Sequence, residues 1–397
     1  MKILICNPGS TSLKFKLWEM PGEKMLAQGR VERIGMGGAI FAYACPEKGA
    51  ELTQEGLDIG GYTQGIELFL KELTGPSGAL DSLAQLDAVG FKTVLSKGYK
   101  GVHRLTGPVL QGMRDYMTVA PAHNGPYLEA IGVFQQLLPG TPLVGAFETA
   151  FHRTIPLYRR LYALPWAWSQ AYGLEKMGFH GASHSYVALK TGGKGRVVSC
   201  HLGGSSSLCA ILDGKSVDNS FGLSLQTGIP HNNRVGDLDP YVLMYLLVRG
   251  MSWAELNRGL TKEAGLKGVS GLSGDMRDIQ KATEAGDQRA QLAFDMFTDA
   301  VKRYIGAYAV ELGGLDQLVF TGGIGENGWQ VRQRVCQGLG CLGVVLDEAA
   351  NRALKGEGTI SAPDSRVLVR VIPANEELMV VRGVVACLED RGEESAP

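Results

Sequence analysis

Residues 5–13 read Ile-Cys-Asn-Pro-Gly-Ser-Thr-Ser-Leu, and residues 199–208 read Ser-Cys-His-Leu-Gly-Gly-Ser-Ser-Ser-Leu. Each stretch is a strand-like apolar run, a turn of small and hydroxyl residues, and the start of a second strand-like run. The later copy continues past Asp213-Gly214, a dipeptide typical of hairpin turns. We therefore predict two similar halves, each opening with a hairpin.

The turn of each hairpin presents backbone N–H groups and hydroxyls, which suit the oxygens of a phosphate group. Hairpins rich in glycine and serine are also common turns without a ligand, and either copy alone favours that plainer interpretation. The matched pair favours a nucleotide cleft between two domains.

The rest of the chain alternates between strand and helix patterns. Strand-like runs lie at 3–6, 13–18, 86–90, 143–146, 197–201, 208–212, 318–320 and 367–372, and a long helical pattern covers 292–312. This alternation predicts an α/β protein. We expect one helix to begin at Asp239-Pro240, with an apolar stripe of Val242, Leu243, Leu246 and Leu247.

Another helix is expected to begin at Asn375, because Glu376 and Glu377 would lie in its first turn, where the helix dipole favours negative charge. The polar tail, 389–397, is expected to fray.

The charge balance is close to neutral, since 39 basic and 40 acidic side chains leave a formal charge of −1. This excludes the strongly basic surface of proteins that are held mainly by nucleic-acid phosphates, so no nucleic-acid partner is expected. The 55 glycines are about twice the ordinary share and predict many tight turns.

Seven cysteines form an odd set without a C-x-x-C pair, and several stand in apolar runs. They predict buried free thiols in a reducing cytosol, with Cys200 and Cys209 in the core. The apolar N-terminal run breaks at Asn7, which is too early for a signal peptide. No apolar run approaches the ~20 residues that span a bilayer, so we expect a cytoplasmic protein with no membrane partner.

A third glycine-rich stretch, 321–328, reads Thr-Gly-Gly-Ile-Gly-Glu-Asn-Gly and follows a short strand. The spacing Gly323-x-Gly325-x-x-Gly328 matches a dinucleotide fingerprint, and Asp347 lies near the offset of a ribose-binding acid. Only about seventy residues follow the loop, whereas a dinucleotide fold builds two βαβαβ halves around it. An NAD-binding protein and a turn without a ligand both remain alternatives.

Further motifs run along nearly the whole chain. They are 7–14 (Asn-Pro-Gly-Ser-Thr-Ser-Leu-Lys), 120–124 (Ala-Pro-Ala-His-Asn), 147–152 (Phe-Glu-Thr-Ala-Phe-His), 178–184 (Gly-Phe-His-Gly-Ala-Ser-His), 201–203 (His-Leu-Gly), 234–240 (Arg-Val-Gly-Asp-Leu-Asp-Pro), 270–278 (Ser-Gly-Leu-Ser-Gly-Asp-Met-Arg-Asp), 322–327 (Gly-Gly-Ile-Gly-Glu-Asn) and 375–377 (Asn-Glu-Glu). In this order the sequence resembles the acetate kinase family, of the superfamily of sugar kinases and actin-like ATPases.

The resemblance implies a duplicated actin-like, ribonuclease H-like α/β fold with two domains facing across a nucleotide cleft. The N-terminal domain would comprise 1–149 together with the returning C-terminal helix in 375–397. The C-terminal domain would comprise 150–374 and carry the adenosine-binding loop.

The implied reaction is a reversible phosphoryl transfer between ATP and acetate, which gives acetyl phosphate and ADP with Mg²⁺ as cofactor. Such a site must neutralise the transferring group and hold the attacking and leaving oxygens in line. The ligands would be ATP or ADP, a short-chain carboxylate and an acyl phosphate. A homodimer is implied by the resemblance alone.

The resemblance also assigns roles to individual residues. The catalytic set would be Arg234, His180, Glu148, Lys92 and His123; the acid pocket Lys92, Val94, Phe179, Ala122 and Leu225; the nucleotide site Lys14, Ser10, Ser12, His201, Gly203, Asp275, Arg277, Gly323, Ile324, Gly325 and Asn327; and the Mg²⁺ site Asn7, Glu376 and Glu148. Arg234 would clamp the phosphoryl oxygens, and His180 would donate to them.

Plainer interpretations stand beside these roles. His180 and His184, four residues apart, would face together as metal ligands on a helix, although no suitably spaced third ligand is evident. An arginine before a helix is usually a solvated charge, and Glu376 would serve as a helix-dipole residue.

Residues 90–97 depart from the family pattern. They read Gly-Phe-Lys-Thr-Val-Leu-Ser-Lys where the family reads Gly-His-Arg-Val-Val-His-Gly-Gly. Lys92 keeps the charge of the arginine but loses its planar, two-pronged donor, which predicts weaker catalysis. Glu148 replaces an aspartate, and Mg²⁺ tolerates misplaced ligands poorly.

Smaller departures affect the pockets. Gly204 stands in place of an asparagine, and Ala122 and Leu225 stand in place of leucine and proline. A smaller side chain at Ala122 would admit a longer acid. Three alternatives therefore remain: a kinase for propionate or a longer acid, a family member that binds ATP without turnover, and an NAD-binding oxidoreductase.

Overall fold

The computed structural model describes residues 1–389, except for the side chains of Pro121 and Ala122. The chain divides into two compact units: unit 1 holds Met1–Ala150 and the C-terminal segment from Glu376, and unit 2 holds Phe151–Asn375. From residue 390 onwards, the tail that is expected to fray lies outside the described residues.

Unit 1 is built on one mixed sheet in the order β5-β4-β3-β2-β1-β6-β8-β7. Its strands are β1 (Lys2–Gly9), β2 (Ser12–Glu19), β3 (Lys24–Glu32), β4 (Ala39–Cys45), β5 (Ala50–Leu57), β6 (Ala88–Phe91), β7 (Val102–Arg104) and β8 (Leu143–Ala146). Its helices are α1 (Tyr62–Leu73), α2 (Gly107–Asp115), α3 (Pro121–Leu137) and α15 (Glu376–Glu389). The first predicted hairpin is confirmed, since β1 and β2 pair antiparallel from Lys2 opposite Glu19 to Gly9 opposite Ser12.

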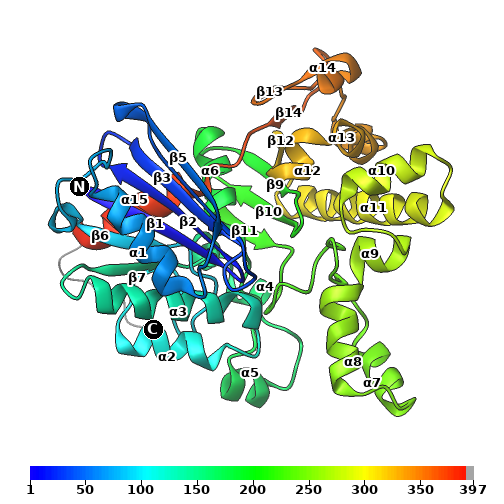
Figure 1. Ribbon diagram of the computed structural model, residues 1–397. Helices are drawn as coiled ribbons and strands as arrows, with labels where there is room; N and C mark the ends of the chain where they lie inside the picture. The colour runs from blue at the N-terminus through cyan, green and yellow to red at the C-terminus, as the bar shows by residue number, and fades with distance from the viewer. Residues whose placement is uncertain (390–397) are drawn as a thin grey trace. The chain divides into compact units, whose positions relative to one another are not determined.

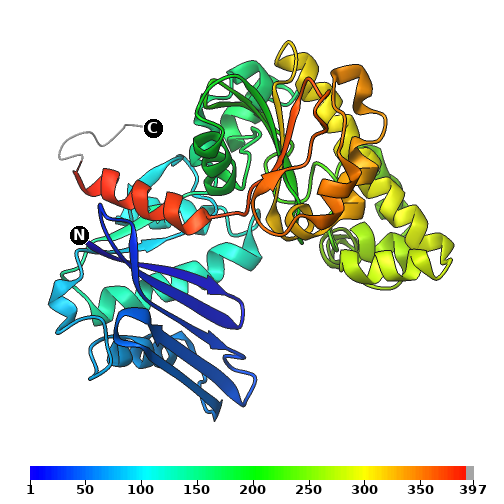
Figure 2. The ribbon, with the colours of Figure 1, turned by 90° about the horizontal axis from the view of Figure 1, so that it is seen from above.

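Helices cover the unit 1 sheet on both faces. The rings of Phe15 on β2 and Phe69 on α1 stack 4.2 Å apart, and Phe91 on β6 meets Phe134 on α3 edge to face at 5.6 Å. On the opposite face α15 lies along β1, β6, β7 and β8 (Figures 1 and 2). A Cβ at Gly90 would come within 2.7 Å of both Ile5 and Val384, so a glycine here allows α15 to approach the sheet.

Unit 2 contains a second mixed sheet, in the order β11-β10-β9-β12-β14-β13. Its strands are β9 (Arg196–His201), β10 (Ser207–Leu212), β11 (Lys215–Asn219), β12 (Gln317–Thr321), β13 (Gly358–Thr359) and β14 (Leu368–Val371). Its helices are α4 (Leu157–Arg160), α5 (Trp166–Tyr172), α6 (Gly181–Lys190), α7 (Pro240–Val248), α8 (Trp253–Arg258), α9 (Gly265–Ser270), α10 (Met276–Glu284), α11 (Gln288–Glu311), α12 (Gly322–Asn327), α13 (Trp329–Cys336) and α14 (Glu348–Ala353).

The two sheets repeat one pattern. In unit 1, β1 is antiparallel to β2 and parallel to β6, while in unit 2, β9 is antiparallel to β10 and parallel to β12. In each unit a third strand then pairs antiparallel with the second strand of the hairpin, β3 with β2 and β11 with β10. The turn between β10 and β11 contains the predicted Asp213-Gly214. The predictions of an α/β fold and of two similar halves are confirmed.

The glycine-rich stretch 322–327 differs from its prediction as a loop, because it folds as helix α12. Gly322 has a φ of +75°, and a Cβ there would lie 2.7 Å from the carbonyl oxygen of Leu202. That same carbonyl accepts the N–H groups of Ile324 and Gly325 at 2.8 and 3.1 Å. The glycine thus lets the chain turn from β12 directly into a helix.

Helix α7 begins at the predicted cap, where Asp239 accepts the N–H of Tyr241 at 2.8 Å. Its predicted apolar stripe is not buried: none of the α7 side chains is buried in the described part of the chain. Figure 1 shows α7 and α8 extending as an arm from the rest of unit 2. Helix α15 begins as predicted, with Glu376 and Glu377 in its first turn.

All seven cysteines are free. Five are buried, among them Cys200 and Cys209 as predicted, whereas Cys341 is exposed and Cys387 is half-buried. Among the described helices, none is long and apolar enough to cross a membrane.

Candidate active site

Three neighbouring strands of unit 1 place polar side chains at one edge of its sheet. Strands β1, β6 and β8 are adjacent and parallel, so their carboxyl ends meet at the same edge. Asn7 lies near the end of β1, Lys92 directly follows β6, and Glu148 follows β8. Glu376 opens α15 and pairs with Lys92. The topology therefore brings together four predicted site residues.

Lys92 lies between two carboxylates. Its Nζ is 2.9 Å from Glu148 Oε1 and forms a hydrogen-bonded ion pair with Glu376 Oε2. Only 6% of the Glu148 side chain is exposed, against 22% for Lys92 and 21% for Glu376. Two carboxylates around one ammonium leave a net negative charge in a poorly solvated place, which attracts a further cation.

The donor atoms of this cluster fit Mg²⁺. Asn7 Oδ1 and Glu148 Oε2 are buried and have no hydrogen-bond partner among the described residues, and the buried Glu148 Oε1 has only its ion pair with Lys92. Buried oxygens of this kind normally have a partner, and carboxylate and amide oxygens are the ligands that Mg²⁺ prefers. The alternative metal site at His180 and His184 lacks a third ligand, because no group of three His, Cys, Asp or Glu suited to a metal occurs in the described residues.

The turn of the first hairpin is tied to its surroundings. Tyr62 donates its hydroxyl to the carbonyl of Gly9, and Ile34 donates its N–H to the carbonyl of Thr11 at 3.0 Å. Ser10 is exposed and Ser12 is half-buried beside it. The turn is thus held while its hydroxyls remain accessible.

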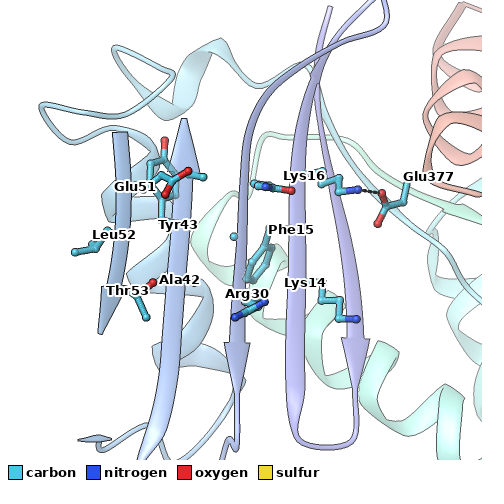
Figure 3. A pocket seen from close by; sticks show the side chains of 13 residues that line it. Lys14, Phe15, Lys16, Arg30, Ala42, Tyr43, Glu51, Leu52, Thr53 and Glu377 are labelled. Carbon is cyan, nitrogen blue, oxygen red and sulfur yellow. Dashed lines mark hydrogen bonds and ion pairs between the residues drawn. The ribbon is translucent and has the colours of Figure 1, made fainter. Parts of the chain in front are cut away.

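Lys14 stands on the face of the unit 1 sheet that carries α15. It is opposite Asn7 on β1 and Arg30 on β3, so the three side chains form one row across the strands. Lys14 and Arg30 border a pocket of about 450 Å³, in which Lys16 pairs with Glu377 (Figure 3). Lys14 thus shares a face with the proposed metal ligand Asn7.

The remaining unit 1 positions belong to the predicted acid pocket and catalytic set. Val94 is buried with 6% of its surface exposed, and His123 is exposed in the first turn of α3. The side chain of Ala122 lies outside the described residues.

The corresponding edge of unit 2 lies at the ends of β9 and β12, where His201 is opposite Thr321. Three atoms bordering the turn after His201 are buried without a partner among the described residues: Ser205 Oγ, Asn232 Oδ1 and Thr321 Oγ1. Asn232 also donates its N–H to the carbonyl of Gly204 at 3.2 Å. Such unpaired atoms at a predicted phosphate turn are available to a ligand.

His231 holds this turn in place through hydrogen bonds of both its ring nitrogens. Burial lowers the pKa of His231 to about 3, so its ring is neutral. Nδ1 accepts the N–H of Ser206 at 3.1 Å, and Nε2 donates to the carbonyl of Thr227 at 3.2 Å. The Ser206 hydroxyl in turn bonds both backbone groups of Gly203, at 3.0 and 2.9 Å.

His180 adopts a strained conformation immediately before α6. Its φ of 56° and ψ of 32° are left-handed, which residues other than glycine seldom adopt and which is common at functional sites. Its ring lies 4.1 Å from that of His201, and its Nδ1 is 2.9 Å from Ser207 Oγ. The neighbouring Phe179 is fully buried and meets Phe221 edge to face.

Arg234 is held within the segment that leads to α7. Its Nη1 donates to the carbonyl of Leu225 at 2.9 Å, which joins two predicted site residues. Burial lowers the pKa of Arg234 to about 10, so the guanidinium remains charged at neutral pH. At Gly265, with a φ of +61°, a Cβ would lie 2.1 Å from the carbonyl oxygen of His231, so the segment packs where only glycine fits.

The predicted adenosine residues form two groups. On α12, Asn327 Nδ2 donates to the carbonyl of Gly323 at 2.9 Å, and a Cβ at Gly323 would meet nothing within 4 Å. At the start of α10, Asp275 accepts the N–H of Arg277 at 2.9 Å and pairs with its guanidinium. This pairing holds the pKa of Asp275 at about 2, and the Arg277 side chain is 88% exposed.

A model of the acetokinase family matches residues 2–382. The chain belongs to the acetokinase family. The predicted family is thereby confirmed, and the NAD-binding alternative is left without support.

Relatives match this acetokinase over nearly their full length. An acetate kinase of Clostridium novyi is 39% identical over 98% of this chain and 99% of its own. A propionate kinase of Citrobacter rodentium is 42% identical over 97% of this chain and 96% of its own.

Solved structures agree with the fold. An acetate kinase of Porphyromonas gingivalis superposes with a TM-score of 0.87 at 36% identity, covering 98% of this chain and 100% of that one. A propionate kinase of Francisella tularensis gives 0.88 at 32% identity, with 96% and 98% covered. The predicted two-domain fold class is confirmed by these matches.

The structure explains part of the departure at 90–97 from the family pattern. Phe91 and Leu95, which stand where the family has histidines, are core residues with 0% and 2% exposure. Lys92 is directed toward the carboxylates of Glu148 and Glu376. The two lost histidines are therefore replaced by packing, and Lys92 alone retains a charge.

Sequence reasoning missed three buried hydroxyls of unit 2. Ser199, Ser205 and Ser207 lie on β9, in the turn and on β10. The signal was present in the run of three serines at 205–207, but the partners of Ser199 and Ser207 are His184, on α6, and His180, directly before it. His184 drew attention only as a metal-ligand alternative, whereas the structure buries it among hydroxyls.

Proposed function

We propose that this protein is an acetate kinase, a phosphotransferase that moves a phosphoryl group reversibly between ATP and the carboxyl group of acetate. The observation that carries the proposal is the match of the acetokinase family to residues 2–382. The retained Arg234 and His180 in unit 2, and the cluster around Glu148 in unit 1, support it.

The proposed domains are 1–149 with 375–397, and 150–374, and each carries part of the residues proposed to bind ATP and the acid. The charged guanidinium of Arg234 would neutralise the oxygens of the transferring group, and His180 would donate a hydrogen bond to them. Lys92 would add a positive charge beside the reacting carboxylate. Val94 in unit 1 and Phe179 and Leu225 in unit 2 are apolar, which suits their proposed contact with a short aliphatic acid.

Asn7, Glu148 and Glu376 would hold Mg²⁺. When bound, the ion would offset the charge on the phosphate oxygens. The buried Asn7 Oδ1 and Glu148 Oε2, which have no hydrogen bond among the described residues, support this assignment.

The test is hydroxamate trapping of acyl phosphate with ATP, Mg²⁺ and one acid at a time. We expect product with acetate, and none when ATP or Mg²⁺ is omitted. A protein that binds ATP and forms no acyl phosphate with any short-chain acid contradicts the proposal and matches the alternative of a member without turnover.

A second candidate is a kinase for propionate or a longer acid. Ala122 in place of leucine favours it, as does the 42% identity to the propionate kinase. One methylene in an apolar pocket changes specificity by roughly 10–200-fold, so kcat/KM values for acetate, propionate and butyrate separate the two candidates.

The donor is proposed to be ATP rather than pyrophosphate. Because the space around Gly323 is open, the Gly323→Gln side chain fits the fold but occupies the place expected for the base. We expect KM for ATP to rise about tenfold or more, which is about 1.4 kcal/mol. Gly340→Gln, at another exposed glycine with open surroundings, is the control. An unchanged KM at Gly323→Gln contradicts the adenosine assignment.

A homodimer is also proposed, with the arm of α7 and α8 as its contact. Val248 on α7 is 84% exposed and Trp253 on α8 is 71% exposed, within a helix pair that carries several exposed apolar side chains. We expect the native protein to have twice the mass of the chain by light scattering, and Val248→Glu to shift it toward the monomer. Val310→Glu, an 80% exposed valine on α11, should leave the mass unchanged. A native monomer contradicts the proposal.

A cytoplasmic location is proposed as well, because all seven cysteines are free thiols, which a reducing compartment preserves. The proposed ligands are ATP or ADP, a short-chain carboxylate and its acyl phosphate, with neither nucleic acid nor membrane as a partner.

A further inference from the structure

A chain of hydrogen bonds leads from the interior of unit 2 to His180. His180 Nδ1 lies 2.9 Å from Ser207 Oγ, and the same oxygen lies 2.8 Å from His184 Nε2. On the other side of the His184 ring, Nδ1 lies 2.9 Å from Ser199 Oγ. His184, Ser199 and Ser207 are fully buried, so their protons must be shared within this chain.

His184 is neutral in this chain. Burial lowers the pKa of His184 well below its ordinary value, and the nearby rings of His152 and His201 lower it further. A neutral imidazole carries one N–H and one acceptor nitrogen. His184 therefore donates to one serine and accepts from the other.

Ser199 decides which way the chain runs. Its hydroxyl has His184 Nδ1 as its only partner among the described residues. If His184 donated to Ser199, the buried Ser199 proton would have no acceptor, which is unfavourable. If Ser199 donates instead, His184 carries its proton on Nε2 and donates to Ser207, and Ser207 donates to Nδ1 of His180.

We infer that Ser199, His184 and Ser207 form a directed hydrogen-bond chain that holds His180 as the tautomer protonated on Nε2. The inference rests on the proposed function, in which His180 donates to the transferring phosphoryl group. With Nδ1 occupied as an acceptor, the His180 ring carries its N–H on Nε2 and can donate it to the phosphoryl oxygens. Ser199, His184 and Ser207 are thus positioning residues.

The tautomer is read directly from long-range ¹H–¹⁵N spectra of protein labelled with ¹⁵N-histidine, with His180 assigned by its loss in His180→Gln. We expect Nδ1 of His180 to have the shift of an acceptor nitrogen and Nε2 that of an N–H. A native His180 that carries its proton on Nδ1 overturns the inference.

Ser199→Ala tests the direction of the chain at a distance, because Ser199 reaches His180 only through His184 and Ser207. We expect the His180 signals to shift toward a mixture of both tautomers. Ser216→Ala is the matched control: Ser216 is equally buried and lies 2.9 Å from Nδ1 of His152, outside the chain. It should leave the His180 signals unchanged. Unaltered His180 signals in Ser199→Ala overturn the inference.

Kinetics supply a second readout. Ser207→Ala should lower kcat about tenfold, as expected for the loss of one oriented hydrogen bond, with KM for ATP within about twofold of native. Ser207→Thr, which keeps the hydroxyl, should recover most of the loss. Equal loss in both variants overturns the positioning role. If the native protein forms no acyl phosphate, the proposed function fails, while the tautomer measurement still tests the hydrogen-bond chain from Ser199 to His180.

Discussion

Arg234→Ala is expected to lower kcat by a factor of about 10²–10³, because the loss of one preorganised donor to a developing charge costs that much in other enzymes. The Arg234 guanidinium is half-buried and bound to the carbonyl of Leu225, so it is oriented before substrate arrives. KM for ATP should change far less, since the residues proposed to bind adenosine lie on α10 and α12. Steady-state kinetics by the hydroxamate assay measure both quantities.

Arg303→Ala is the control for this prediction. Arg303 lies on α11 with 79% of its side chain exposed, so it shows what the removal of a solvated arginine does in the same unit. If Arg234→Ala behaves like Arg303→Ala, then Arg234 is a solvated charge as well, and the phosphoryl clamp must be sought elsewhere.

The fold was predictable where strands are short apolar runs bounded by turn residues. Both hairpins and the parallel strands β6, β8 and β12 meet that condition. Strands β4 and β5 were not predicted, for two different reasons. In β4 the buried Phe41 and Tyr43 alternate with Ile40 and Ala42, which are also apolar, so no polar alternation is visible. Strand β5 is mostly exposed and has almost no apolar pattern.

Helix α12 shows how local composition misleads. The glycines at 322–328 predict a loop, but whether a glycine-rich segment forms a loop or a helix depends on the residues that pack against it. Here the carbonyl of Leu202, more than a hundred residues earlier in the chain, accepts the N–H groups that start the helix. No local pattern contains that contact.

The candidate site could be proposed from the sequence as a set of residues but not as an arrangement. Family motifs identify Lys92, Glu148 and Glu376, which are distant in sequence. Their ion pairs depend on the parallel order of β1, β6 and β8 and on the return of α15 to the unit 1 sheet. The sequence also could not indicate that Phe91 and Leu95 are core residues. Only their burial in the structure shows that packing has replaced the two histidines of the family.

Lys92→Ala is expected to have two effects of opposite sign. In the native protein the Lys92 ammonium pairs with Glu148 and Glu376, the carboxylates proposed for Mg²⁺. Without it, these two poorly solvated carboxylates lose their cation and should attract a divalent ion more strongly. We therefore expect Mn²⁺, used as a probe for Mg²⁺, to bind about tenfold more tightly, or about 1.4 kcal/mol, by calorimetry or electron paramagnetic resonance.

Turnover should move the other way. If the Lys92 charge acts on the carboxylate and phosphoryl group, Lys92→Ala lowers kcat by about 10²-fold while KM for ATP changes less. Lys16→Ala is the matched control, because Lys16 pairs with Glu377, the next residue of α15, and not with Glu148. It should alter neither Mn²⁺ affinity nor kcat.

Lys92→Arg then distinguishes a weakened acetate site from a rebuilt one. A guanidinium would restore the two-pronged contact of the family, so a rise in kcat/KM for acetate indicates a conventional site weakened by lysine. A fall for acetate, with the native lysine more active on propionate or butyrate, indicates that Lys92 and Glu148 form a pair rebuilt for another acid. If Lys92→Ala retains full activity on every acid and binds Mn²⁺ as the native protein does, Lys92 neither shares the carboxylates with a metal nor takes part in catalysis.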